Sequence, residues 1–241
     1  MPIDDDAVSP RLGWSTRTVT GSAAELHRLD DFDERSLTLC APSTGAVVLG
    51  STQDAADVDV DRAAALGLEV VRRRSGGGAV FVDPVDSIWI DAWIPRADPL
   101  WVDDISASMS WLGRAFAAIL TDVVGAGAEI DVATGAFEAG EHGRSICFLG
   151  TAPGEVMVRG DAVGADRGDR FAGKVVGISQ RRDRRGARLQ SVLYRRWDPG
   201  RWAVFGDAAL ARALDEVAVH PVDVEPADLL SRLVAHLNAG G

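Results

Sequence analysis

Three consecutive glycines interrupt a strand-like part of the chain. Residues 68–83 read LEVVRRRSGGGAVFVD, so the glycines lie between two runs with β-strand character. Glycines in such a place are unfavourable by about 0.5–1 kcal/mol each relative to alanine, but they let other groups approach the backbone. No GxxxxGK[ST] occurs, and a dinucleotide-binding GxGxxG should open a helix, so these two nucleotide-binding folds are excluded. The glycine segment is then either an anion-binding loop or a flexible hairpin tip.

The remaining pattern predicts an α+β fold with a mixed, largely antiparallel sheet flanked by helices. Alternating apolar residues predict strands in LTLCAP, GAVVLGS, LEVVRRR, AVFV, DSIWIDAWIP, SICFL, GEVMVRG, GKVVGISQRR and ARLQSVLYRRW. A capping-box spacing of Ser22 and Glu25 starts a helix over residues 23–31. Further helices are expected at residues 61–67, 101–124, 207–217 and 226–237, from apolar periodicity, Pro226 and Gly240.

Composition narrows the class of protein. The 241 residues are 46% hydrophobic and 25% charged, as in ordinary globular domains, and no linker or repeat divides them. The net charge of −11 disfavours nucleic acid as a partner. We expect no membrane association and a cytoplasmic location, because apolar runs are short and the first residues are acidic. Neither the two cysteines nor the four histidines have metal-binding spacing, so no metal site is expected.

A single lysine stands out among the basic residues. Lysine and arginine together occupy 25 positions, and only Lys174 is a lysine. Solvated lysines are readily replaced by arginine, whereas a site that needs one compact ammonium cannot accept the broad guanidinium. Lys174 is therefore a candidate functional residue, although one lysine can also remain by chance.

Two separate motifs give the chain a family resemblance. RRRSGGGAVFVD resembles the RRxSGGGAVxHD signature of lipoate-protein ligase A and its relatives in the biotin and lipoate ligase superfamily. GKVVGISQRR resembles the family's GxKxxGxAQ strand, and VVLGSTQ is similar to its VVxGxxQ segment. The resemblance is collinear over residues 45–193 and implies the family's catalytic-domain fold. It implies one domain over residues 1–241, closed by the helices within 207–237, without a separate accessory domain.

The resemblance also implies an activity. Relatives use ATP and Mg²⁺ to convert lipoate or octanoate into an acyl-adenylate. They then transfer the acyl group to a lysine of a lipoyl carrier domain, in 2-oxoacid dehydrogenase E2 subunits or the glycine cleavage H protein. By the same correspondence Lys174 touches the acyl carbonyl and the phosphate, and Gly177 and Gln180 shape the acyl pocket. The residues implied to cradle the adenylate are Arg73, Ser75, Gly76, Gly77, Gly78, Ala79 and Val80.

The chain departs from the family pattern in ways that leave alternatives open. Val82 occupies the usual histidine position, and Ser191 and Val192 follow Gln190 where relatives have His-Gly. A non-catalytic acyl-binding or cofactor-binding module is one alternative. Another is an octanoyltransferase that needs no ATP and takes the chain from acyl carrier protein through a cysteine thioester. Cys147, in SICFLGTAPGE, matches that cysteine, and we expect Lys174 to lower its pKa; a buried structural cysteine is the simpler role.

Arginines crowd the end of the lysine strand and the turn after it. Because carrier domains of this kind are acidic, these arginines are a candidate docking surface in an otherwise acidic chain. A solvated hairpin with charged flanks is the alternative. The proposed docking residues are Arg181, Arg182, Arg184 and Arg185, with Arg188 at the edge.

Overall fold

The structure is a computed structural model that describes residues 13–124, 128–159, 173–216 and 219–240. A seven-stranded sheet has the order β1-β2-β6-β10-β9-β8-β7. The first two strands pair in parallel, and each of the other neighbours is antiparallel. Its strands are β1 (Ser15–Gly21), β2 (Ser36–Pro42), β6 (Ser87–Pro95), β7 (Glu129–Val132), β8 (Val156–Arg159), β9 (Gly173–Arg182) and β10 (Gly186–Tyr194).

A smaller, three-stranded sheet has the order β4-β3-β5. Its strands are β4 (Glu69–Arg72), β3 (Ala46–Leu49) and β5 (Val80–Val82). The central strand pairs in parallel with β4 and antiparallel with β5. The mixed, mostly antiparallel α+β architecture predicted from the sequence is confirmed.

The helices are short and cover both faces of the large sheet. They are α1 (Ala23–Arg28), α2 (Val60–Ala65), α3 (Ser110–Leu120), α4 (Ala208–Glu216) and α5 (Pro226–Asn238), with 3-10 turns η1 (Ala55–Asp57), η2 (Cys147–Leu149) and η3 (Pro199–Phe205). The predicted capping box is present, because Ser22 Oγ accepts from Glu25 N and Glu25 bonds back to Ser22 N. In the described part of the chain, none of these helices could cross a membrane.

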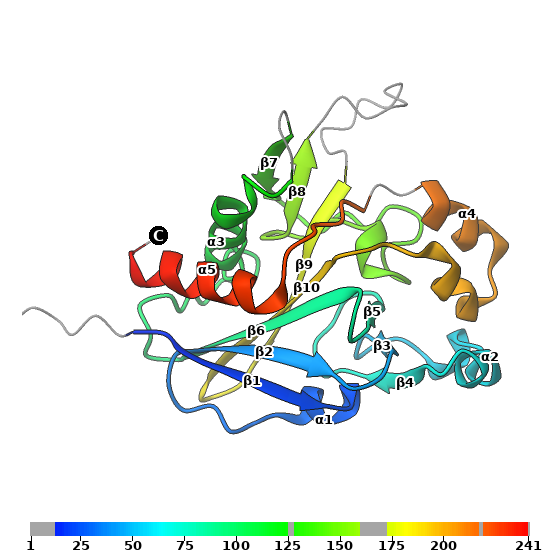
Figure 1. Cartoon of the computed structure of the whole chain (residues 1–241), viewed down its shortest axis with the longest axis horizontal. Helices are drawn as coiled ribbons and strands as arrows, with labels where there is room; N and C mark the ends of the chain where they lie inside the picture. The colour runs from blue at the N-terminus through cyan, green and yellow to red at the C-terminus, as the bar shows by residue number, and fades with distance from the viewer. Residues whose placement is uncertain (1–12, 125–127, 160–172, 217–218, 241) are drawn as a thin grey trace, which may run out of the picture.

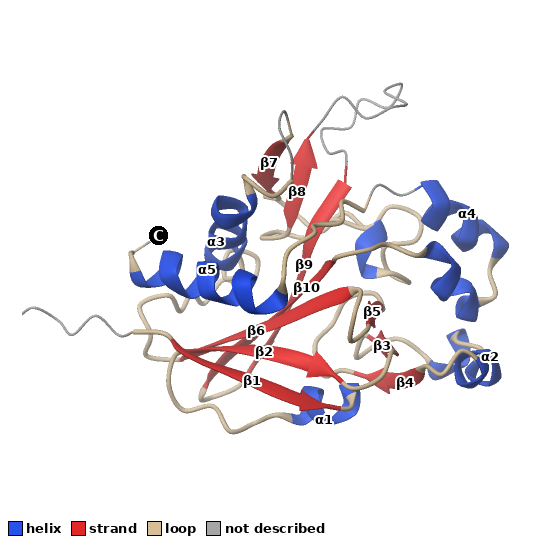
Figure 2. Ribbon diagram, viewed as in Figure 1, coloured by secondary structure: helices blue, strands red, loops and turns tan. Residues whose placement is uncertain are grey.

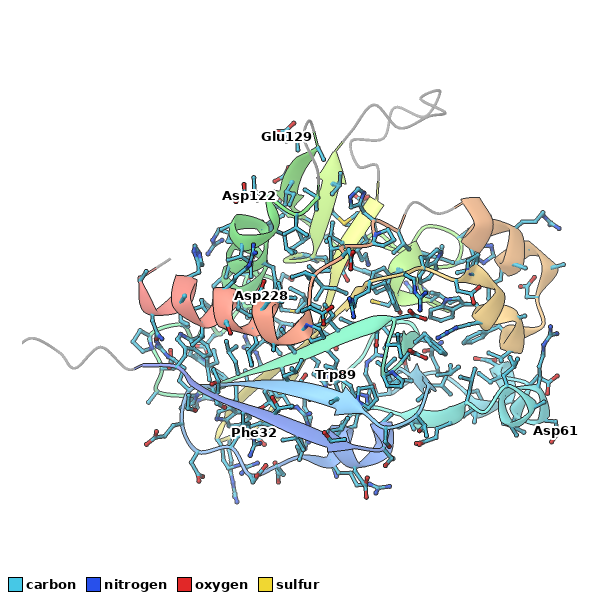
Figure 3. All side chains as sticks on the ribbon, viewed as in Figure 1. Phe32, Asp61, Trp89, Asp122, Glu129 and Asp228 are labelled. Atoms are coloured by element: carbon cyan, nitrogen blue, oxygen red, sulfur yellow. The ribbon has the colours of Figure 1, made fainter. Side chains whose placement is uncertain are left out.

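Two apolar cores lie on opposite faces of the large sheet. On one face α3 and α5 pack together against the strands, through residues such as Phe116 and Leu233. On the other face the small sheet, α1, η2, η3 and α4 enclose a second core around Trp89 and Tyr194. Figures 1 and 2 show α3 and α5 on one side of the sheet, with the small sheet and α4 on the other. Trp89 lies inside, whereas Asp61 and Asp122 lie at the periphery (Figure 3).

Several local predictions were wrong or incomplete. SICFL is not a strand: only Ile146 pairs, with Ala79, and the chain then turns into η2. The helix expected over residues 101–124 is confined to α3, because turns around Asp98 and Asp104 precede it and Ile105 is exposed. Strands β1 and β7 were not predicted. Val217, the predicted end of the fourth helix, lies outside the described residues.

Candidate active site

The glycine loop packs directly on the VVLGSTQ segment. A Cβ on Gly50 would lie 1.9 Å from the carbonyl oxygen of Gly77, so the two backbones touch. Ser51 N donates to Ser75 O at 3.0 Å. Gln53 accepts from Gly50 N at 2.8 Å and donates to Ser145 O at 2.9 Å. This close approach explains why position 50 needs glycine. It also shows that the glycine loop is packed against the protein and is not a free hairpin tip.

The same loop holds the segment that carries Cys147. Ala79 N donates to Ser145 O at 2.8 Å, and Cys147 N donates to Ala79 O at 2.9 Å. A Cβ on Gly78 would lie 2.7 Å from Cys147 N. The loop thus places η2 and its cysteine against the start of β5.

Arg73 lies inside the glycine loop. It is 4% exposed, and it donates to Val48 O, Gly76 O, Gly78 O and Ser75 Oγ at 2.7–3.1 Å. These bonds fix the loop's shape and leave the guanidinium little capacity for a phosphate. Its neighbours Arg72 and Arg74 are exposed, and neither side chain makes a hydrogen bond or an ion pair with the described residues. The outward cations flanking the glycines are therefore Arg72 and Arg74, which the sequence analysis did not single out.

A bulge in β9 turns Lys174 toward the site. Met157 of β8 pairs with Lys174 and Val156 pairs with Val176, which leaves Val175 as an extra residue. As a result Val175 and Val176 both enter the core under α3 and α5. Lys174 shares the opposite face with Gly177, although simple alternation would separate them.

The ammonium of Lys174 is buried and paired. The residue is 2% exposed, and its Nζ lies 2.6 Å from Glu155 Oε2. It also donates to Cys147 O at 2.6 Å and lies 5.4 Å from the centre of the Phe148 ring. Glu155, which is 1% exposed, is held by Ala152 N at 2.7 Å. Glu155 was missed in the sequence, although a buried lone lysine requires such a counter-ion.

Cys147 is next to both charges, but its thiol is not activated. The Sγ atom lies 3.7 Å from Glu155 Oε1, to which it donates. Burial raises the pKa of Cys147, an effect that Lys174 opposes and Glu155 reinforces. The expectation that Lys174 gives Cys147 a lowered pKa was therefore wrong. The thiol is protonated near neutral pH.

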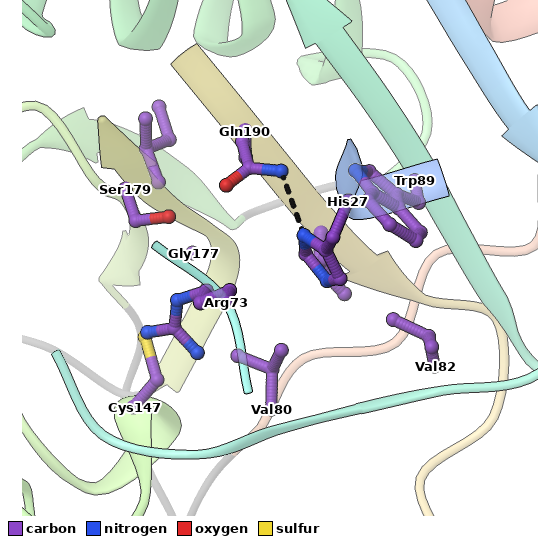
Figure 4. Close-up of a pocket in the computed structure, with 11 residues that line it drawn as sticks. His27, Arg73, Val80, Val82, Trp89, Cys147, Gly177, Ser179 and Gln190 are labelled. Carbon is purple, nitrogen blue, oxygen red and sulfur yellow. Dashed lines mark hydrogen bonds between the residues drawn. The ribbon is translucent and has the colours of Figure 1, made fainter. Parts of the chain in front are cut away.

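A narrow pocket runs from Cys147 between the two sheets. Its empty space is about 340 Å³, part of it open to solvent. The walls are mainly apolar, and Figure 4 shows Cys147 at one end and His27 with Trp89 at the other. The predicted pocket residue Gly177 and the loop residue Val80 line it. The remaining lining residues are Arg73, Val82, Ile178, Ser179, Gln190 and Val192.

A chain of polar contacts crosses the pocket wall. Ser75 Oγ lies 3.1 Å from Gln190 Oε1 and 3.1 Å from Ser179 Oγ. Gln190 Nε2 lies 3.1 Å from His27 Nδ1, and the His27 ring stacks near Trp89 with centroids 4.4 Å apart. His27 therefore brings an imidazole from α1 into the pocket beside Val82. Motif matching missed it because α1 lies outside both signatures.

Gln180 does not lie in the pocket. It follows Ser179 on β9, so strand alternation turns it to the other face. There its side chain accepts from Ser108 Oγ at 2.9 Å and donates to Ile105 O at 2.8 Å. Gln180, which was predicted to shape the acyl pocket, is thus not among the residues that line the pocket described above.

The arginines of the hairpin differ in availability. Arg188 is buried: it pairs with Asp91 and donates to the carbonyls of Leu26, His27 and Leu29, so it caps α1 and is excluded from any docking surface. Arg182 bonds the carbonyls of Val102 and Asp103, and Arg185 pairs with Asp30. Arg184 is exposed and Arg181 half-buried, and neither has a partner among the described residues.

The family model for the lipoyl protein ligase A/B catalytic domain matches residues 23–214. The chain belongs to this family. The match spans the glycine loop, η2, the lysine strand and α1, so the pocket described above lies within the family's catalytic domain. No curated protein sequence matches the chain.

Several solved structures described as lipoate-protein ligases are similar to the chain at low sequence identity. A protein from T. acidophilum with bound lipoic acid has a TM-score of 0.64 and 17% identity, over 94% of this chain and 84% of that one. A lipoate-protein ligase A with bound ATP gives 0.62 and 16%, over 94% and 84%. The bipartite ligase of T. acidophilum, studied with its E2 lipoyl domain, gives 0.62 and 17%, over 94% and 82%. These likenesses establish a shared fold.

Proposed function

We propose that this protein is an ATP-dependent ligase that attaches a lipoyl or octanoyl group to a lysine of lipoyl carrier domains. The observation that carries the proposal is the buried ammonium of Lys174, which does not itself line the apolar pocket but donates to the carbonyl of Cys147, a residue that does. The bound lipoic acid and ATP of structural relatives support the choice of substrates. The E2 lipoyl domain studied with another supports the partner, and the H protein is a further candidate.

Lys174 is suited to stabilise charge that develops on an acyl oxygen. Its ammonium carries three N–H donors, of which Glu155 and Cys147 O each take one. The third has no acceptor among the described residues, and we propose that it meets the acyl carbonyl of a substrate bound next to Cys147. A fixed cation in a buried site stabilises an oxyanion strongly, because little water competes and the group need not reorganise.

The glycine loop is proposed to bind the phosphates of ATP. A carboxylate oxygen of the acid would attack the α-phosphorus of ATP and release pyrophosphate, and AMP would leave the acyl group when the carrier lysine attacks. Gly76 and Gly77 are exposed, and a Cβ on Gly76 would meet no atom within 4 Å, so the backbone is accessible there. Arg72 and Arg74 flank it with exposed cations. Exposed backbone with adjacent guanidinium groups suits an anion. Mg²⁺ belongs to the proposal only as the usual partner of ATP.

The second candidate is the cysteine-dependent transfer of an octanoyl group from acyl carrier protein. It is favoured by the position of Cys147, whose side chain lines the pocket within reach of Glu155. The raised pKa of this thiol counts against it, because the thiolate is the nucleophile. A non-catalytic binding module does not explain the buried ion pair of Lys174 and Glu155 next to Cys147.

The intact mass of a purified lipoyl domain tests the proposal. The domain is incubated with lipoate, ATP and Mg²⁺, or with octanoyl acyl carrier protein alone, for the wild type and Cys147→Ser. We expect a lipoyl mass gain that needs ATP and persists in the serine variant. A gain from the acyl carrier protein alone, lost in the serine variant, would establish the second candidate instead. No gain from either donor would favour the binding module.

A further inference from the structure

One polar atom in the pocket wall lacks a partner. His27 Nε2 is buried from solvent and makes no hydrogen bond in the described part of the chain. The other buried side-chain nitrogens without partners belong to residues that do not line this pocket. Buried donors are normally satisfied, so one that faces a binding pocket calls for an explanation.

The contacts around His27 determine which nitrogen carries its proton. In the structure Gln190 directs its amide oxygen Oε1 to Ser75 Oγ at 3.1 Å, so its amide nitrogen, which can only donate, faces His27. Gln190 then presents its amide N–H to His27 Nδ1. Because Nδ1 accepts, the proton of the neutral ring is on Nε2. The unpartnered atom is therefore a hydrogen-bond donor.

The ring is held neutral and in a fixed plane. Burial, with Arg188 and Arg73 nearby, lowers the pKa of His27 to about 3, so the imidazole is uncharged at physiological pH. The contact with the Trp89 ring restricts rotation. His27 thus presents one N–H in one direction and does not act as a proton shuttle.

This donor lies at the end of the pocket away from the reactive groups. In Figure 4, Cys147 is on one side of the pocket and His27 and Trp89 on the other, and the His27 nitrogen that does not contact Gln190 faces the space near Val80 and Val82. Valine and tryptophan side chains surround that space. An acyl chain whose carboxyl end is at Lys174 would therefore bring its tail to His27.

We propose that His27 is a specificity-determining residue that recognises the tail of the acyl chain. Its Nε2–H bonds an acceptor there, so the dithiolane sulfurs of a lipoyl group are preferred over the methyl end of an octanoyl group. An octanoyl tail leaves the buried donor unpaired. Since sulfur is a weak acceptor, we expect a preference of about tenfold, which corresponds to about 1.4 kcal/mol. This inference rests on the proposed function, because it takes the pocket to be the acyl site.

Equilibrium binding of the free acids to the full chain tests the inference without requiring catalysis. Calorimetry with lipoic acid and octanoic acid is run on the wild type, on His27→Phe and on a control, His236→Phe, which changes a histidine of α5 outside the pocket. The wild type and the control should bind lipoic acid about tenfold more tightly. In His27→Phe, which keeps an aromatic ring but no donor, the two affinities should become equal.

A second measurement covers the case in which His27→Phe does not fold. In the wild type, the Nε2–H proton resonance of His27 should shift on addition of lipoic acid and stay in place with octanoic acid. Equal affinities in the wild type, a preference that persists in His27→Phe, or identical spectral responses to both acids would each overturn the role of His27. Failure of the folded wild type to bind either acid would overturn the proposed function as well.

Discussion

Glu155 balances the charge of Lys174 in a place that water does not reach. The two residues are 1% and 2% exposed and form a 2.6 Å ion pair. Glu155→Gln preserves the size of the side chain but leaves a buried ammonium without its counter-ion. We predict a loss of about 3–5 kcal/mol in the free energy of unfolding, measured with urea.

The control for this change is Glu225→Gln, which removes the carboxylate from an exposed pair with Arg195. Its effect should stay within about 0.5 kcal/mol. If Glu155→Gln were as stable as the control, the ion pair would not hold the site together as described.

His27 makes stability depend on pH. The ring is neutral in the folded protein, with a pKa of about 3, but protonates near 6.5 in the unfolded chain. Its contribution is therefore present above about pH 6.5 and is lost as pH falls toward 3. Between pH 7 and pH 5 the wild type should lose about 2 kcal/mol more than His27→Phe in urea unfolding. Parallel pH profiles for the two proteins would contradict the buried, neutral state of His27.

At the level of structural elements, the close packing of the glycine loop against η2 positions Cys147. A Cβ on Gly78 would meet backbone atoms of Ile146, Cys147 and Gly143 at 2.7–2.8 Å. Gly78→Ala should therefore destabilise the fold by about 1–3 kcal/mol, and it should lower kcat/KM at least tenfold by displacing η2. Gly76→Ala is the matched control for stability, because its Cβ meets no atom within 4 Å. Equal melting temperatures for the two variants would refute this packing.

The elements also show what the sequence could and could not predict. The glycine loop and the lysine strand were recognisable because a close backbone approach and a lone lysine each leave a local signal. The direction of the Arg73 side chain was not recognisable, because its partners Val48 of β3 and Gly78 of the glycine loop come together only in the fold. The β9 bulge that directs Lys174 to the site depends on pairing with β8, which the sequence does not show. SICFL resembled a strand because its residues are mostly apolar, but only Ile146 forms a β-bridge.

At the scale of the whole molecule, an acidic protein is proposed to bind acidic carrier domains. The net charge is −11, and we propose that the exposed arginines in the turn after β9 provide the local attraction. Arg184 is the best probe, because it is exposed and without a partner in the described chain, whereas Arg185 pairs with Asp30. Arg184→Glu should raise the KM for the carrier about threefold to tenfold at low salt and flatten its salt dependence.

Arg212→Glu on α4 makes the same change in net charge away from the hairpin and should leave the KM unaltered. If both variants changed the KM equally, the effect would come from net charge and the docking surface would be refuted. If neither changed it, the carrier would bind elsewhere.

We propose that Lys174 stabilises the activation of a carboxylic acid by ATP in this pocket. Lipoate-dependent exchange of pyrophosphate into ATP measures that step without a carrier domain. We predict exchange in the wild type and in Cys147→Ser, and a loss of at least a hundredfold in a folded Lys174→Arg variant, because guanidinium does not fit the space between Glu155 and Cys147 O. Exchange that survived in Lys174→Arg, or its absence from a wild type that still acylates the carrier, would exclude this role of Lys174.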